Sequence, residues 1–231
     1  MINKFFNNLA TQFNTDNLKN HYVVSAPIPH LIIDNFLPPA VYTDLLDEIQ
    51  NFPQDKWIVK NLPPSGTRKE SRDFTSSPVI QEIMTQLTAH SFVTWIGAIT
   101  GCTDIIPDIH HLGAGLTSAP TNASLGLHVD FNWNNTLKLN RKFNLILYSN
   151  RSWEDEWDGN LEFWNKERTE CLHSISPLPN RLVFWEYEQS LLHGHPKPLK
   201  CPAGIERQNL MTIYYTSNAT PASQPHKSDF Y

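Results

Sequence analysis

The sequence has no long apolar segment and little cysteine. No run of about 18 apolar residues occurs in the 231-residue chain, so we expect no membrane-spanning helix. The first twenty residues also lack the apolar stretch of a secretory signal. Cys102, Cys171 and Cys201 are odd in number and scattered, which predicts buried free thiols rather than a Cys171–Cys201 bridge. These absences predict a cytoplasmic protein with reduced cysteines.

The sequence also lacks an excess of basic residues. It has 18 Lys and Arg against 23 Asp and Glu, a net charge of -5. This balance excludes the electrostatic footprint of a nucleic-acid-binding protein, so we expect no nucleic-acid partner. Internal repeats and low-complexity tracts are absent as well. A hydrophobic fraction of 40% and seven Trp instead indicate a folded chain that can bury a sizeable core.

The first part of the chain has the spacing of helices. Residues 29–37 predict a strand, and Pro38-Pro39 then opens a helix, because proline fits the first helical turn. A second helix is predicted from Ser77-Pro78. Residues 61–72 between them are polar and predict a loop, either an ordinary solvated connection or one flanking a site entrance. The apolar positions at helical spacing are Val41, Leu45, Leu46 and Ile49 in the first helix, and Ile80, Ile83, Met84, Leu87 and Trp95 in the second.

From about residue 105 the pattern changes to short strands separated by turn residues. This arrangement predicts a mainly β protein with flanking helices, a double-stranded β-helix (jelly roll) preceded by an N-terminal helical segment. With no linker in the sequence, we expect one domain over residues 1–231, with a mostly helical support region (1–104), a jelly-roll core (105–216) and a C-terminal tail (217–231). The predicted strands are 109–116, 124–130, 142–149, 160–164, 171–175, 181–187, 190–193 and 207–216.

A pattern of metal-ligand residues lies within these strands. His128 and Asp130 are two apart on one predicted strand and therefore point to the same face. His193, from a distant strand, would complete a set of two histidines and one carboxylate. Such a set occupies one face of an octahedral iron and leaves positions open. The sequence therefore predicts a metal site at His128, Asp130 and His193.

Other histidines compete for the third ligand position. His195 shares the strand parity of His193, but Gly194 and Pro196 suggest that the strand ends there, which favours His193. His110 and His111 are adjacent, and adjacent strand residues point to opposite faces. We therefore interpret that pair as making capping or solvent contacts.

An arginine follows the third predicted ligand along the sequence. Arg207 opens the last predicted strand, 14 residues after His193. A dicarboxylate that chelates a metal with one end needs a planar, permanently charged partner at the other end. Asn144 and Tyr148 share one face of the strand 142–149. The acidic turn 153–158 could attract a cationic substrate, although a solvated turn is the favoured interpretation.

Taken in order, these segments resemble the prolyl 4-hydroxylase-like branch of the 2-oxoglutarate- and Fe(II)-dependent dioxygenases. The resemblance runs from about Gly113 to Tyr215. The segments that carry it are LHVDFN, RKFNLILYSN, DGNLEFW, NRLVFWE, LLHGHP and ERQNLMTIYY. Two departures stand out. The turn usually has two glycines where this chain has Gly159-Asn160, and the loop from His193 to Arg207 is longer than in many relatives.

The resemblance implies an enzyme that hydroxylates an aliphatic C–H bond in a peptide or a small metabolite and releases succinate and CO2. It implies His128, Asp130 and His193 as iron ligands. It also implies that Arg207 pairs with the distal carboxylate of 2-oxoglutarate and that Tyr148 hydrogen-bonds to it, with Asn144 nearby. Fe(II), 2-oxoglutarate and O2 are the implied cofactors, with ascorbate a candidate reductant.

Two other classes remain open at this stage. A cupin-type metalloenzyme that does not use 2-oxoglutarate could use the pair His193 and His195, but the glutamate that usually follows about four residues later is missing. A catalytically silent jelly-roll binding module would need no complete triad, whereas this one looks complete. The sequence leaves the substrate and the oligomeric state open.

Overall fold

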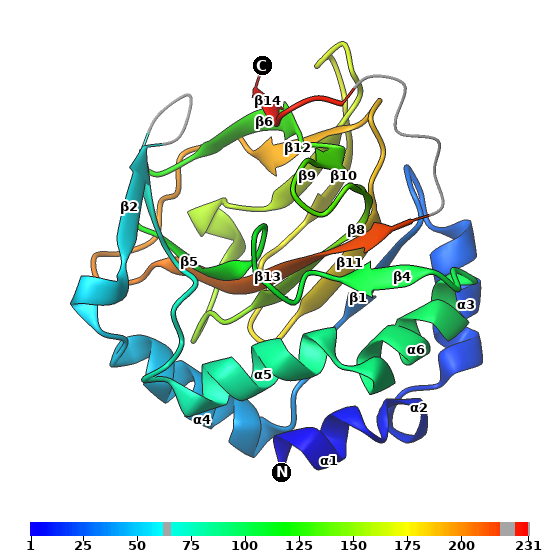
Figure 1. The fold of residues 1–231 in the computed structure, drawn as a ribbon. Helices are drawn as coiled ribbons and strands as arrows, with labels where there is room; N and C mark the ends of the chain where they lie inside the picture. The colour runs from blue at the N-terminus through cyan, green and yellow to red at the C-terminus, as the bar shows by residue number, and fades with distance from the viewer. Residues whose placement is uncertain (62–65, 218–224, 231) are drawn as a thin grey trace.

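The computed structural model describes residues 1–61, 66–217 and 225–230. Two antiparallel β-sheets face each other, and helices pack below the larger sheet in the view of Figure 1. The amino terminus lies among these helices, while β14 near the carboxyl terminus lies at the opposite end beside β6. This is the predicted jelly-roll class with an N-terminal helical segment.

The helices come mainly from the first hundred residues. α4 begins at the expected prolines, with Pro38 as its N-cap. The second predicted helix is divided into α5 and α6, because Ala89 has an extended backbone with ψ of 154°. The expected single helix reaching Trp95 was therefore wrong. The helices are α1 (Ile2–Phe6), α2 (Leu9–Gln12), α3 (Thr15–Val24), α4 (Pro39–Gln50), α5 (Pro78–Thr88) and α6 (His90–Thr100), with 3₁₀ turns at Gln54–Lys56 and Asp155–Trp157.

The larger sheet has the strand order β1-β11-β8-β13-β5-β3-β2, with β4 paired to β13 and β7 to β8. Three of its strands precede residue 105, so the support region contributes directly to the sheet. Its strands are β1 (His30–Ile33), β2 (Ile58–Asn61), β3 (Thr67–Ser71), β4 (Ile105–Pro107), β5 (Gly115–Ala119), β7 (Trp133–Asn134), β8 (Leu139–Tyr148), β11 (Leu182–Glu186) and β13 (Arg207–Thr216).

The smaller sheet has the strand order β10-β9-β12-β6-β14. It is built entirely from the second half of the chain and lies opposite the inner face of the larger sheet (Figure 1). Its strands are β6 (Leu125–Val129), β9 (Leu161–Trp164), β10 (Cys171–Ile175), β12 (Leu192–His195) and β14 (Asp229–Phe230).

Strand alternation decides what each face of the larger sheet buries. On β8, Phe143, Leu145 and Leu147 join the apolar cluster that the helices complete. The alternate residues Asn144 and Ile146 face the space between the sheets, as expected from their two-residue spacing. The helix-side face of the larger sheet therefore packs into the main core, and the opposite face lines the cavity between the sheets.

Two local expectations were wrong. The predicted strand 109–116 is largely a turn, and β5 starts only at Gly115. Residues 67–71, expected as loop, form β3, which pairs with the exposed strand β2 on one side and with β5 on the other. Residues 62–65 of that predicted loop lie outside the described residues. A polar strand carries no apolar alternation, so its pairing could not be read from the sequence.

Two composition-based expectations were tested by the structure. Within the described part of the chain, no helix is long and apolar enough to cross a bilayer. All three cysteines are free, as predicted. Only Cys201 is fully buried, and Cys171 is exposed on β10.

Candidate active site

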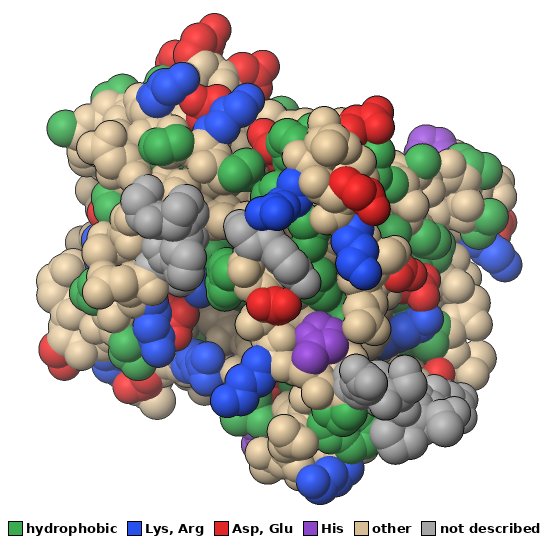
Figure 2. All heavy atoms as spheres, turned by 90° about the horizontal axis from the view of Figure 1, so that it is seen from above, with side chains coloured by type: hydrophobic (Ala, Val, Ile, Leu, Met, Phe, Trp, Pro, Cys, Tyr) green, Lys and Arg blue, Asp and Glu red, His purple; other side chains and the backbone are tan. Residues whose placement is uncertain are grey.

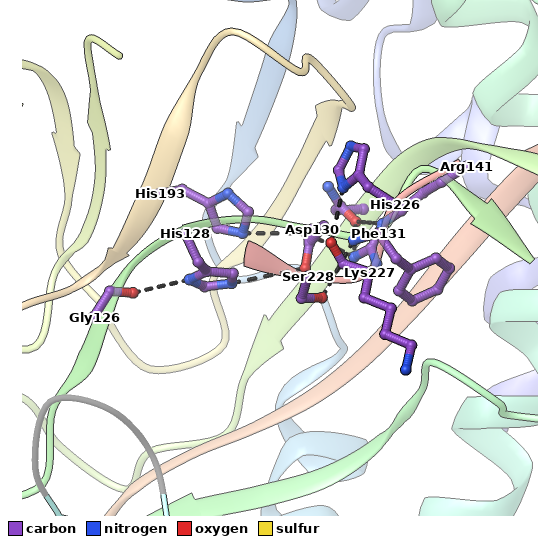
Figure 3. A network of polar contacts seen from close by, with 10 residues as sticks. Gly126, His128, Asp130, Phe131, Arg141, His193, His226, Lys227 and Ser228 are labelled. Atoms are coloured by element: carbon purple, nitrogen blue, oxygen red, sulfur yellow. Dashed lines mark hydrogen bonds and ion pairs between the residues drawn. The ribbon is translucent and has the colours of Figure 1, made fainter. Parts of the chain in front are cut away.

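Two adjacent strands of the smaller sheet bring the predicted ligands together. β6 carries His128 and runs into Asp130, while β12 pairs with it so that His193 lies directly opposite His128. The ligand atoms of these three residues all lie within 4.8 Å of one another. In Figure 3, both imidazoles point toward the Asp130 carboxylate. The described residues contain no other such group of three histidine, cysteine or acidic side chains.

The tautomer of His128 suits a metal site. The Nδ1 atom of His128 lies 2.9 Å from the Gly126 carbonyl oxygen, so Nδ1–H donates there and Nε2 keeps its lone pair. That Nε2 lies 3.7 Å from the Asp130 Oδ1, and the His193 Nε2 lies 3.2 Å from the Asp130 Oδ2. Burial, followed by the nearby His193, lowers the pKa of His128 to about 4. A neutral imidazole of this kind is the form that binds a metal.

Arg141 on β8 approaches Asp130 from the side away from the histidines (Figure 3). Its Nη2 lies 2.8 Å from the Asp130 Oδ2, and its Nε donates to the Asn144 Oδ1 at 2.7 Å. Burial alone would raise the pKa of Asp130, but Arg141 and His193 hold that pKa well below its usual range. Asp130 is therefore a carboxylate. Asn144, expected near the cosubstrate, lines the cavity and accepts hydrogen bonds from Arg141.

The three clustered residues line one end of a cavity between the sheets. Its volume is about 210 Å³, below the roughly 300–1,000 Å³ of pockets that hold drug-sized ligands. Figure 2 shows the molecule from the side of β6 and β14, where the surface is hollowed and Lys and Arg side chains lie around the hollow. A small anion is the kind of ligand that fits this space.

Arg207 lines the other end of the same cavity, with Tyr148 behind it. The Arg207 Nη2 donates to the Tyr148 hydroxyl at 3.0 Å, and its Nε donates to the Gly159 carbonyl oxygen at 2.7 Å. Both side chains are buried, and no carboxylate of the described residues forms an ion pair with Arg207. A buried guanidinium without a counter-charge is costly. The predicted pair therefore meets in space with one positive charge available for a ligand.

Gly159 is needed for this arrangement. Its φ is +83°, and a Cβ there would lie 2.6 Å from Leu199 and 3.2 Å from the Cδ of Arg207. The turn with a single glycine therefore still allows the backbone to approach the arginine and accept its hydrogen bond.

β12 continues through His195, contrary to the expectation that it ends before that residue. His195 therefore also faces the cavity, but it is displaced from Asp130 toward Arg207 and is absent from the group of clustered ligands. His110 and His111 lie in a turn outside the cavity. The pair His193 and His195 does not converge on one metal position.

The end of the chain covers the outer edge of β6. Asp229 and Phe230 in β14 pair with Val129 and His128, and the Phe230 ring stacks on the His128 imidazole at 4.8 Å between centroids. The Ser228 hydroxyl accepts a hydrogen bond from the Phe131 N–H at 3.2 Å. Residues 218–224 and 231 of the expected tail lie outside the described residues.

The cavity-lining residues that sequence reasoning missed include Arg68, Arg141 as a partner of Asp130, and Phe230. Arg68 lies in the segment expected as loop, and Phe230 lies in the expected tail. Neither segment carries a periodic pattern that could have placed it. Only Arg141 had a usable signal, because it begins the segment RKFNLILYSN.

Comparisons with known proteins agree with this geometry. The model of the 2OG-Fe(II) oxygenase superfamily matches residues 114–216. A search of curated proteins finds no match. Structural similarity is clear at low sequence identity. A prolyl hydroxylase from Trichoplax adhaerens, in complex with a peptide fragment of the hypoxia inducible factor oxygen degradation domain, has a TM-score of 0.63 and 17% identity, over 88% of this chain and 89% of that one.

Two further structures have the same fold. A prolyl-4-hydroxylase from Pseudomonas putida has a TM-score of 0.63 and 14% identity, over 89% of this chain and all of that one. HygX from Streptomyces hygroscopicus, with nickel, 2-oxoglutarate and hygromycin B bound, has a TM-score of 0.55 and 10% identity, over 84% of this chain and 85% of that one.

Proposed function

We propose that this chain, whose residues 114–216 match the model of the 2OG-Fe(II) oxygenase superfamily, hydroxylates an aliphatic C–H bond in a peptide side chain or a small metabolite. Fe(II) and 2-oxoglutarate are the cofactor and cosubstrate of this superfamily. The single observation that carries the proposal is one cavity with His128, Asp130 and His193 at one end and, at the other, Arg207, which has no ion-pair partner among the described residues.

The roles of the residues follow from their places in that cavity. We assign His128, Asp130 and His193 as the metal ligands, because two imidazoles and one carboxylate are the donor set of a non-haem iron site. Arg207 would pair with the distal carboxylate of 2-oxoglutarate, and Tyr148 would hold the guanidinium in place. Fe(II) and 2-oxoglutarate, when bound, supply the oxidising chemistry and consume O2, with succinate and CO2 as by-products.

Other side chains prepare the site for that chemistry. Arg141 orients the Asp130 carboxylate through its 2.8 Å ion pair and is itself held by Asn144. Phe230 lies against His128 and limits the access of water to the ligand end. Ascorbate remains a candidate reductant.

The nature of the substrate is part of the proposal. The similar Trichoplax structure holds a peptide fragment, and HygX holds hygromycin B, so the fold accommodates both classes in other proteins.

We also propose that residues 1–231 form one domain and that the protein is cytoplasmic, in keeping with its three free cysteines.

The first prediction tests the metal ligands. Wild-type protein should bind one Fe(II) per chain under anaerobic conditions, and Asp130→Ala should abolish that binding because it removes the only carboxylate of the cluster. Isothermal titration calorimetry measures it. Asp44→Ala, an exposed carboxylate on α4, is the matched control and should bind iron like the wild type. Equal Fe(II) affinity in wild type and Asp130→Ala would falsify the metal assignment.

Turnover is tested separately with the loaded protein. Succinate should form from 2-oxoglutarate in the presence of O2, and a panel of peptides, amino acids and sugar derivatives should reveal which class stimulates it. No succinate with any member of the panel, despite intact Fe(II) binding, would contradict the hydroxylase proposal.

A further inference from the structure

β12 presents a second histidine to the cavity. His195 is two residues after His193 on β12, and both line the cavity. Only His193 belongs to the ligand cluster with Asp130. The Gly194 backbone between the two histidines lies close to β6. A Cβ at this position would be 2.7 Å from the carbonyl oxygens of both Gly126 and Leu125. The backbone therefore has little freedom, and the direction of the His195 side chain is fixed.

The His195 side chain is buried without a protein partner for one of its nitrogens. The residue is 5% exposed, and its Nδ1 makes no hydrogen bond within the described part of the chain. Leaving a buried polar group unsatisfied costs about 1–3 kcal/mol, so such groups usually have a partner. Because His195 lines the cavity, a ligand there can be that partner.

Two arginines share this end of the cavity with His195. Ala119 on β5 pairs with Arg207 on β13, and the register Lys69–Ser118 places Arg68 beside Ala119 on its other side. Arg68, His195 and Arg207 all line the cavity and come from strands of both sheets.

The positive charges at the Arg207 end of the cavity favour an anionic ligand. Arg207 has no carboxylate partner among the described residues, and Arg68 has Glu70 at 3.2 Å. The His195 imidazole can supply an N–H donor to such an anion.

We propose that His195 donates a hydrogen bond to the distal carboxylate of 2-oxoglutarate, alongside the ion pair from Arg207. His193 would then bind the metal at one end of the cosubstrate, and His195 would hydrogen-bond to the distal carboxylate at the other end. This inference rests on the proposed function. It assigns to His195 a role in cosubstrate recognition rather than in metal binding.

The test compares two keto acids. 2-Oxobutyrate has the same 1-carboxylate and 2-keto group as 2-oxoglutarate but ends in a methyl group. Dissociation constants for both acids are measured by calorimetry with Mn(II) in place of Fe(II), so that no turnover occurs. The proteins are wild type, His195→Ala, His195→Gln and Arg207→Ala, each first checked for a native circular dichroism spectrum and for Mn(II) affinity.

His195→Ala should weaken 2-oxoglutarate binding about ten-fold, the lower range for a hydrogen bond to a charged group. Binding of 2-oxobutyrate and of Mn(II) should be unchanged. His195→Gln keeps an N–H donor and should recover part of the loss, and it serves as the folded variant if His195→Ala does not fold.

The outcomes separate this inference from the proposed function. If Arg207→Ala weakens 2-oxoglutarate binding but neither His195 variant does, the role of His195 is wrong and the cosubstrate site stands. If the His195 variants weaken both keto acids equally, the residue acts on the structure of the site and the inference is overturned. If Arg207→Ala leaves 2-oxoglutarate binding unchanged, the proposed carboxylate site itself fails.

Discussion

Arg207 shows how much a single residue depends on its surroundings. Its guanidinium is buried, its Nε is fixed by the Gly159 carbonyl oxygen, and its Cζ lies 5.0 Å from the centroid of the Tyr148 ring. The hydrogen bond uses one edge of the planar guanidinium, and the Tyr148 ring lies against its face. The remaining N–H donors of Arg207 have no hydrogen-bond partner within the described part of the chain and can bind a carboxylate, with a geometry that a lysine ammonium cannot reproduce.

We therefore predict graded effects on 2-oxoglutarate binding at this position. Arg207→Ala should weaken it by roughly ten- to a hundred-fold, since a charge-assisted hydrogen bond contributes about 1.5–3 kcal/mol. Arg207→Lys should restore only part of the loss. Tyr148→Phe should weaken 2-oxoglutarate binding less than Arg207→Ala, because it removes the hydroxyl that holds the guanidinium but leaves the charge in the cavity.

Anaerobic titration of 2-oxoglutarate into the Fe(II)-loaded proteins measures these constants. Iron affinity serves as the internal control, because neither Arg207 nor Tyr148 belongs to the ligand cluster. Full recovery by Arg207→Lys would contradict the need for a planar fork. Arg181 is a poor alternative partner, because it already pairs with Asp34.

At the scale of elements, one ion pair joins the end of β1 to the start of β11. The Arg181 Nε and Nη2 lie 2.5 and 2.9 Å from the two carboxylate oxygens of Asp34, and the Arg181 Nη1 donates to the Ser176 carbonyl oxygen. The Asp34 side chain is 52% exposed, so solvent screens the pair and its contribution is at most about 1 kcal/mol. It anchors the edge strand of the larger sheet.

This pair predicts a pH dependence of stability. The hydrogen bonds from Arg181 lower the pKa of Asp34 below its usual value. A lowered folded-state pKa stabilises the native state at pH values above the unfolded pKa, and the stabilisation is lost as the pH falls through the folded pKa. Asp34→Asn should therefore lower the free energy of unfolding by up to about 1 kcal/mol at pH 7, and the difference should vanish in acid.

Urea unfolding at pH 7, 5 and 3 measures this difference. Asp44→Asn, at an exposed position on α4, controls for the loss of one negative charge. A destabilisation by Asp34→Asn that is equal at all three pH values would show that the ion pair is not its cause.

At the scale of the whole molecule, the front of the chain is more than a support. β1, β2 and β3 belong to the larger sheet, and Phe6, Leu45 and Phe92 share one apolar cluster with Leu147 and Leu210. The tail strand β14 belongs to the smaller sheet. Both sheets are therefore completed by residues outside the predicted core of 105–216.

We accordingly predict that residues 105–216 do not fold alone. The fragment would expose the helix-side face of the larger sheet, and burial of such apolar surface is the main favourable term in folding. Urea unfolding followed by circular dichroism should show a cooperative transition for the full chain and none for the fragment. A cooperative, iron-binding fragment would instead establish a domain boundary near residue 104.

Much of the site could be predicted because its signals are local. His128 and Asp130 share a face through two-residue alternation alone, and β10 and β13 have their predicted bounds. The segments 67–71 and 229–230 could not be predicted, since they are short, polar or exposed and pair only because a neighbouring strand offers an open edge. The reason given for preferring His193 was wrong, since β12 continues through His195.

The sequence by itself determined the jelly-roll class, the strands that carry His128, Asp130, His193 and Arg207, and the faces on which these residues lie, because strand periodicity is a property of the local chain. Only the tertiary structure decided which residues meet across the cavity. Arg68, His195 and Arg207 come from three strands in two sheets, and Arg141 reaches Asp130 from β8. Such convergence depends on sheet order and register, which long-range packing sets and no local pattern encodes.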